Sequence, residues 1–260
     1  HSCGDSALPV SQDQPLQGAF AGDTFFLARL VADEAAPMWN VATRIEAFRL
    51  PPGGVADPVS AWSEAIPDAW AYGMAADGSG VLVSGPVFGA LPGQASAGGS
   101  DAFVRRYDDE TGATSWTLQF GTAAQDTPFA VTGDSELLLV CGQTTGAMEG
   151  GTGVPLPDAD GFLAAIERPD SPRQMMSGLI ERIEGLIDDG TLKLGQGKSL
   201  IGKLELALYM LEWGNIKKAT TMLEAFIHEV KAFRNAGILE PDEADAMVAI
   251  AEAAIASIAG

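Results

Sequence analysis

Two patterns of apolar positions divide this chain of 260 residues. Up to about residue 168, short segments alternate apolar and polar residues between clusters of Gly, Asp, Thr and Pro, as in DAFVRRY followed by DDETG. A period of two bounded by turn residues predicts antiparallel β-strands. From residue 172 the apolar positions recur every three or four residues, which is typical of amphipathic helices. The sequence therefore predicts a multidomain β + α protein.

The boundary between the two patterns carries a signal of its own. Asp170-Ser171-Pro172 is typical of a helix N-cap followed by Pro in the first turn. Beyond it we predict four helices: 172–188, 197–213, one capped by Asn215 and one from Pro241 onward. Their short connections predict a small antiparallel four-helix bundle. The predicted domains are β repeats over 1–168, a linker over 169–173 and the bundle over 174–260.

The β half repeats itself. The spacing from Phe26 to Trp39 is the same as the spacing from Phe103 to Trp116. Four positions recur at one constant offset along the chain, namely Asp77, Val81, Val83 and Gly85 as Asp134, Leu138, Val140 and Gly142. Phe162 begins a third copy of the Phe motif. Repetition at a fixed period indicates stacked copies of one structural unit.

The copies are expected to be unequal. Trp39 and Trp116 are further apart than this constant offset, so we predict an insertion, placed in the Pro- and Gly-rich loop 51–58. Such a loop carries binding function in some proteins, and a tolerated surface loop is the simpler interpretation. Met175 stands where the spacing predicts a Trp, which predicts that the third copy lacks its last strand. The first copy is expected to lack its early strands.

The middle copy resembles the bacterial propeller repeat called SBBP. The matching residues are Gly98-Gly99-Ser100-Asp101-Ala102-Phe103-Val104, Trp116 and Gln119-Phe120-Gly121-Thr122. The resemblance covers about residues 1–168 and implies a partial β-propeller of antiparallel blades, usually in exported proteins, without implying a reaction. The residues expected to define the repeat structurally are Asp101, Phe103, Trp116, Gly142, Phe26, Trp39 and Phe162.

The helical half is similar to the FIMAH domain of bacterial exported proteins. The similarity lies in Gly197-Lys198-Ser199-Leu200, Trp213-Gly214-Asn215 and Glu240-Pro241-Asp242-Glu243-Ala244-Asp245-Ala246, and spans about residues 174–258. It implies a bacterial cell-surface context and supplies no catalytic residue.

Charge excludes some partners. The chain has 35 acidic and 15 basic residues and a net charge of −20, and residues 1–170 contain no lysine. Nucleic-acid binding requires a basic footprint, and an anionic membrane surface repels such a chain. No apolar run approaches the roughly 20 residues of a membrane-spanning helix.

Candidate chemistry is sparse. With only two His, a Ser/His/Asp or Cys/His site or a zinc site cannot be assembled. Carboxylates are abundant, and Asp108 with Asp109, and Asp158 with Asp160, form acidic turns that supply the oxygen ligands Ca²⁺ prefers. A solvated turn is the simpler interpretation of both. We therefore expect no cofactor, with Ca²⁺ as the alternative, and no enzymatic activity.

The two cysteines are expected to be free thiols. Cys3 and Cys141 occupy equivalent repeat positions two copies apart, beyond the roughly 7 Å Cα separation that a disulfide tolerates. Cys3 is alternatively the lipidated residue of a bacterial lipoprotein. The chain begins inside a repeat, which predicts a fragment of an extracellular or cell-surface protein.

Two functions remain. The first is a non-catalytic exported bacterial protein whose propeller loops bind a protein or a glycan, with the helical module appended. The alternative is the accessory C-terminal region of a secreted hydrolase whose catalytic domain lies upstream. Three repeats do not close a propeller, so self-association through exposed faces is also expected. Those faces are predicted to carry Val81, Val83, Leu138 and Val140.

Overall fold

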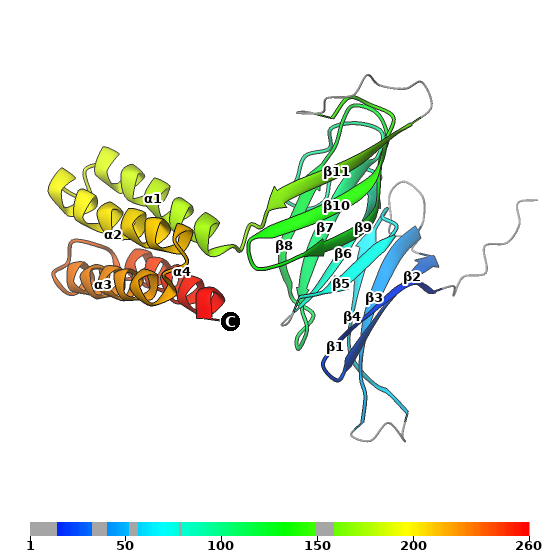
Figure 1. Cartoon of the computed structure of the whole chain (residues 1–260), viewed down its shortest axis with the longest axis horizontal. Coiled ribbons are helices and arrows are strands. Elements are labelled where there is room, and N and C mark those ends of the chain that lie inside the picture. Colours follow the sequence, from blue (N-terminus) through cyan, green and yellow to red (C-terminus); the bar gives the residue numbers. More distant parts are fainter. Residues whose placement is uncertain (1–14, 33–40, 52–56, 78–79, 149–158, 260) are drawn as a thin grey trace, which may run out of the picture. The chain divides into compact units, whose positions relative to one another are not determined.

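A computed structural model describes residues 15–32, 41–51, 57–77, 80–148 and 159–259. The chain divides into two compact units. The first holds residues 1–134 and 138–166, and the second holds residues 135–137 and 167–260. The described residues form antiparallel sheets followed by four helices (Figure 1), which confirms the predicted order of β structure and then α structure.

Three antiparallel sheets build the first unit. The first sheet has the order β1-β2-β3-β4, with strands Pro15–Ala21, Thr24–Ala32, Val41–Arg49 and Val59–Pro67. The second has the order β5-β6-β7-β8, with strands Gly73–Ala76, Gly80–Val87, Asp101–Asp108 and Thr114–Phe120. The third pairs β9, β10 and β11, which span Asp126–Gly133, Leu137–Thr144 and Asp160–Glu167. In each sheet, strands that follow one another in sequence are neighbours.

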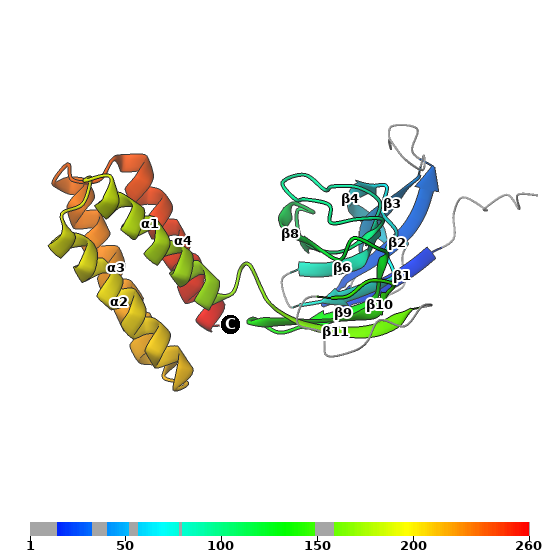
Figure 2. The same ribbon diagram turned by 90° about the horizontal axis from the view of Figure 1, so that it is seen from above.

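The second sheet is the middle layer of this unit. Its β6 and β7 are buried along nearly their whole length, because both faces of the sheet are covered. One core joins it to the first sheet and includes Phe26, Ile45 and Phe103. A smaller core joins its Leu82 and Val104 to Val131, Leu138 and Val140 of the third sheet. The first strands of the sheets contact one another in succession, β1 with β5 and β5 with β9. Figure 2 shows the third sheet, β9 to β11, as one layer along the lower side of the first unit.

The first sheet differs from the prediction. It has four strands, whereas the sequence predicted that its early strands were missing. Phe26 lies on the second strand of its sheet and Phe103 on the third, so their equal spacing to a Trp does not mark equivalent strands. The structural counterpart of Trp116 is Trp62, since both lie on the fourth strand of a sheet.

With Trp62 rather than Trp39 as the counterpart of Trp116, no insertion is needed in the loop 51–58. The separation of Trp62 and Trp116 along the chain is close to the constant offset of the repeat. The Pro- and Gly-rich stretch joins β3 to β4 within one sheet, and its residues 52–56 lie outside the described part of the chain, as does Trp39. The third sheet has three strands, and Met175 lies in a helix.

The helices of the second unit begin close to their predicted starts. They are α1 Pro172–Asp188, α2 Leu194–Glu212, α3 Ile216–Asn235 and α4 Pro241–Ala259. The Ser171 hydroxyl caps α1 by accepting a hydrogen bond from Gln174 N at 3.1 Å. Helix α2 starts at Leu194 rather than at the predicted 197, because Lys193 N donates to Gln196 Oε1 at 2.9 Å and extends the first turn.

One apolar core runs through the four helices. Its fully buried members include Met176, Leu200, Leu204, Phe226 and Met247. Gly197 lies where α1 and α2 approach closely, since a Cβ there would stand 2.3 Å from Ile187. No helix in the described part of the chain is long and apolar enough to cross a membrane.

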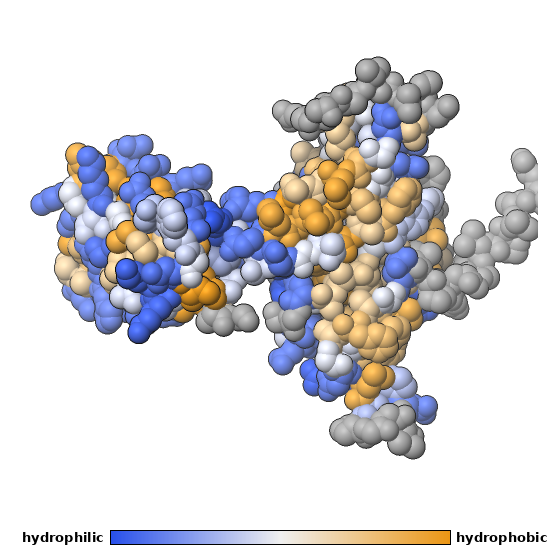
Figure 3. Space-filling model, viewed as in Figure 1, coloured by the Kyte–Doolittle hydropathy of each residue, from blue (hydrophilic) through white to orange (hydrophobic). Residues whose placement is uncertain are grey.

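Several exposed apolar side chains of the first unit lie on its third sheet. Figure 3 shows orange residues gathered over β10 and β11. Leu139 and Leu163, on these two strands, are 43% and 72% exposed. By contrast, the four residues predicted to lie on exposed faces are all fully buried, namely Val81, Val83, Leu138 and Val140. That prediction was wrong, because the sheets cover one another with these residues inward.

Candidate functional site

A polar recess of about 310 Å³ opens in the first unit, between elements of its first and second sheets. The β1–β2 turn contributes its lining from Ala21 to Thr24, the end of β3 contributes Arg49, and the β7–β8 turn contributes Asp109 and Glu110. These segments are far apart in sequence. The recess therefore depends on the packing of one sheet against the other.

The β1–β2 turn is short and fixed from both sides. Ala21 pairs directly with Thr24, and Gly22 between them has a φ of 57°, a left-handed conformation that Gly adopts without strain. The carbonyl of Asp23 accepts a hydrogen bond from Leu50 N at 2.8 Å. Thr24 pairs in turn with Arg49 on β3. The hairpin thus sets Asp23 and Arg49 side by side at the rim.

The β7–β8 turn is stabilised by its own first residue. Asp108 accepts hydrogen bonds from the backbone N and the hydroxyl of Thr111, at 2.8 and 2.7 Å. These bonds favour the ionised form and hold the pKa of the Asp108 carboxyl below its ordinary value. Gly112 closes the turn with a φ of 73° and a backbone bond to Asp108 O at 3.0 Å.

Trp62 of the first sheet fixes this turn in place. Its indole Nε1 donates to the carbonyl of Asp109 at 2.9 Å. Its ring lies against Gly112, where a Cβ would stand only 2.6 Å from the nearest ring atom. The ring also packs on Phe26 and Tyr107, with centroids 5.8 Å apart in both cases. One aromatic side chain therefore joins the sheets and positions the acidic side of the recess.

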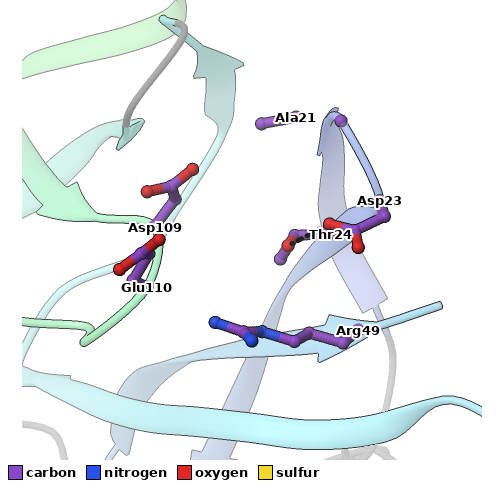
Figure 4. Close-up of a pocket in the computed structure, with 7 residues that line it drawn as sticks. Ala21, Asp23, Thr24, Arg49, Asp109 and Glu110 are labelled. Atoms are coloured by element: carbon purple, nitrogen blue, oxygen red, sulfur yellow. Dashed lines mark hydrogen bonds between the residues drawn. The ribbon is translucent and has the colours of Figure 1, made fainter. Parts of the chain in front are cut away.

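The recess combines one guanidinium with three carboxylates. Figure 4 shows the Arg49 guanidinium directed toward the side where Asp109 and Glu110 lie, with Asp23 and Thr24 on the opposite side. Arg49 makes no ion pair within the described residues, and its side chain is exposed. Such a site offers hydrogen-bond donors and acceptors to a polar ligand. None of the described residues that line it carries an imidazole or a thiol.

The structure does not assemble the calcium candidates. Asp108 is engaged with Thr111, and Asp109 lies at the rim of the recess. Asp160 begins β11 in another sheet, and Asp158 lies outside the described residues. Among the residues that the structure describes, no group of three or more His, Cys, Asp or Glu side chains is placed to hold a metal ion.

Asp101, expected to define the repeat, is fully buried and has a structural role. Its Oδ2 accepts from Ala97 N at 2.9 Å and from Gln119 Nε2 at 2.7 Å. Gln119 also accepts from Leu91 N at 2.9 Å, so the two side chains hold the long β6–β7 connection against β7 and β8. Asp126, which the sequence did not single out, is also fully buried and accepts from Thr122 N and the Thr144 hydroxyl.

The other expected repeat residues also lie away from the recess. Phe26 and Phe103 are in the core between the first two sheets, while Trp116 and Phe162 border the core between the second and third. Gly142 permits close backbone packing, since a Cβ there would stand 2.2 Å from Thr127 O. Cys141 is an exposed free thiol, and Cys3 lies outside the described residues.

The sequence did not predict most of the recess. Asp109 was predicted only as a candidate Ca²⁺ ligand and Glu110 only as part of an acidic turn. Asp23 and Arg49 belong to no motif that indicates a binding site. Arg49 ends a strand of the first sheet and Asp109 follows a strand of the second, and nothing in either segment indicates the other.

No protein-family model matches the sequence, and no curated protein matches it.

Proposed function

We propose that this chain is a non-catalytic binding scaffold from an exported bacterial protein, built as a partial β-propeller of SBBP type with a FIMAH-type helical module appended. The stacking of the three sheets supports the propeller assignment. In each sheet the strands follow in sequence order, and the first strands β1, β5 and β9 are neighbours, as expected where successive blades surround a common axis.

The observation that carries the binding function is the recess at the edge of two adjacent sheets. Rigid sheets commonly present binding residues on the loops that connect their strands. Here two tight turns and a strand end bring Asp23, Arg49 and Glu110 around one opening. The carboxylates of the lining can accept hydrogen bonds from the hydroxyl groups of a ligand, and the guanidinium can donate hydrogen bonds to the oxygens of those hydroxyl groups. The lining therefore suits a hydroxyl-rich ligand. The ligand class proposed is therefore a glycan.

The test is glycan-array screening of the full chain, followed by calorimetric titration with any glycan that binds. Arg49→Ala is expected to weaken binding at least fivefold, because charge-assisted hydrogen bonds are the stronger contacts of such a site. Arg44→Ala is the matched control, since Arg44 is an exposed arginine on the same strand outside the recess. Absence of any bound glycan, or equal losses in the two variants, would overturn the proposal.

A further inference from the structure

The outer face of the third sheet carries apolar side chains of the kind that are usually buried in a protein core. On β10, Leu138 and Val140 point to the second sheet and are fully buried, while the alternate residues Leu139 and Cys141 are exposed. Leu163 on the neighbouring β11 is 72% exposed. Large apolar groups gathered on one exposed face of a soluble unit indicate an interaction surface.

The repeat shows what covers such a face elsewhere in the molecule. The constant offset of the repeat places Leu139 at the position of Leu82, and Leu163 follows Phe162 as Val104 follows Phe103. Leu82 and Val104 are both fully buried. They are covered by the third sheet, through Val131, Leu138 and Val140. Equivalent positions are thus closed in the second sheet and open in the third.

The first sheet exposes the complementary face. On β2, Phe26 and Ala28 point into the core shared with the second sheet, so the alternate residues Phe25 and Leu27 lie on the outer side. Phe25 pairs with Phe48 on β3, just as Val81 pairs with Tyr107 in the second sheet. Val81 belongs to the face by which the second sheet packs on the first. The outer face of the first sheet is therefore the counterpart of that face, and no other sheet of the described residues packs on it.

We propose that the outer face of the third sheet binds the outer face of the first sheet in a second copy of this chain, head to tail. The contact repeats the packing that already joins the second and third sheets, with Leu139 and Leu163 in the places of Leu82 and Val104. Such a contact is heterologous, so copies joined by it either close into a ring or continue as an open chain. The net charge of −20 opposes association, and added salt strengthens it by screening.

Two single-face variants test the geometry. Leu163→Lys blocks the third sheet and Leu27→Lys blocks the first, and sedimentation velocity of the full chain measures association across concentration and salt series. The wild type is expected to associate, more strongly at higher salt. Each variant alone is expected to remain a monomer. An equimolar mixture of the two is expected to form a species of two chains and no larger, because it contains one complete interface.

Leu206→Lys is the matched control, because Leu206 is 41% exposed on α2, outside both faces, and should associate like the wild type. Circular dichroism checks folding, and Phe20→Lys replaces Leu27→Lys if that variant fails to fold, since Phe20 is 63% exposed and pairs with Phe25. A monomeric wild type at every salt concentration would overturn the proposal. So would association of either variant alone, or a mixture that stays monomeric. None of these results depends on the proposed glycan recess.

Discussion

The two units of this chain bury different kinds of side chain. In the sheets, buried polar and charged residues occur throughout, and they include Asp101, Arg105, Arg106, Asp126 and Thr144. In the helical unit the described buried polar residues are Arg168 and Ser171, both of which precede α1. The helices are held together by an apolar core, while the sheets also depend on specific polar partners.

The ion pairs of Arg106 and Arg182 show this difference between the two units, because one pair is nearly buried and the other is partly exposed. In the sheets, Arg106 donates to both carboxylate oxygens of Asp77, at 2.8 and 3.2 Å, and both side chains are nearly buried. In the helical unit, Arg182 pairs with Glu243 between α1 and α4, and the two side chains are 38% and 25% exposed. Water compensates a lost partner at an exposed pair and cannot do so at a buried one. The sheets should therefore tolerate polar substitutions less well than the helices.

The largest effect should come from the apolar core of the helices. Phe226→Ala removes a fully buried ring from α3 and is expected to lower the free energy of unfolding of the helical unit by about 4 kcal/mol. Denaturant unfolding followed by circular dichroism at the helical minimum measures it. Leu206→Ala, at an exposed position, is the control and should cost well under ~1 kcal/mol. Similar losses in both variants would mean that this core does not carry the stability of the unit.

Next comes the buried ion pair of the sheets. Asp77→Ala leaves the Arg106 guanidinium buried without this partner and should destabilise the first unit by about 3 kcal/mol. Glu243→Ala, at the exposed pair, should cost only about 0.5 kcal/mol. Hydrogen exchange of β6 and β7, compared with that of α1 and α4, measures each loss in its own unit. Equal losses would remove the contrast between the units.

Glycine substitutions should act in opposite directions in the two units. Gly142→Ala forces a Cβ to within 2.2 Å of Thr127 O, so β9 and β10 must separate, at a cost of about 2 kcal/mol. Gly178→Ala in α1 meets open space and should stabilise the helical unit by about 0.7 kcal/mol, because Ala favours the helix. Thermal melts of the two variants, compared with the wild type, measure both signs. Stabilisation by Gly142→Ala would contradict the close packing of these strands.

The smallest expected effect is a lowered carboxyl pKa, which occurs once in each unit. Asp108 and Asp189 each accept hydrogen bonds from a nearby Thr, and these bonds lower the pKa of both carboxyls below the ordinary value of 3.8. A lowered pKa means that the stabilisation is present above pH 3.8 and is lost as the pH falls through the folded-state pKa. Carbon-detected NMR titration should give a low pKa for both. Thr111→Val should return Asp108 alone toward its ordinary pKa.

Local signals were sufficient for three of the four helix starts, whereas the start of α2 at Leu194 was missed. Ser171, Asn215 and Pro241 mark helix starts through contacts within one turn, and the helical period of the apolar residues marks the buried face, so neighbouring residues decide the outcome. In the β region the sequence alone predicted antiparallel strands and a repeat of constant offset. It also placed a helix immediately after the third copy.

Only the tertiary structure decided the strand order of the first sheet and the position of the recess. The Phe-to-Trp spacing is the same for Phe26, on the second strand of its sheet, and for Phe103, on the third strand of another sheet. Alternation of apolar and polar residues does not indicate which place a strand takes in its sheet. The strands of Val81 and Leu139 are both apolar on two faces, as is typical of strands covered on both sides. The sequence therefore could not show that Val81 is buried while Leu139 is exposed. Arg49 and Glu110 meet at the recess because Trp62 packs two sheets together, and that contact joins segments with no local relation.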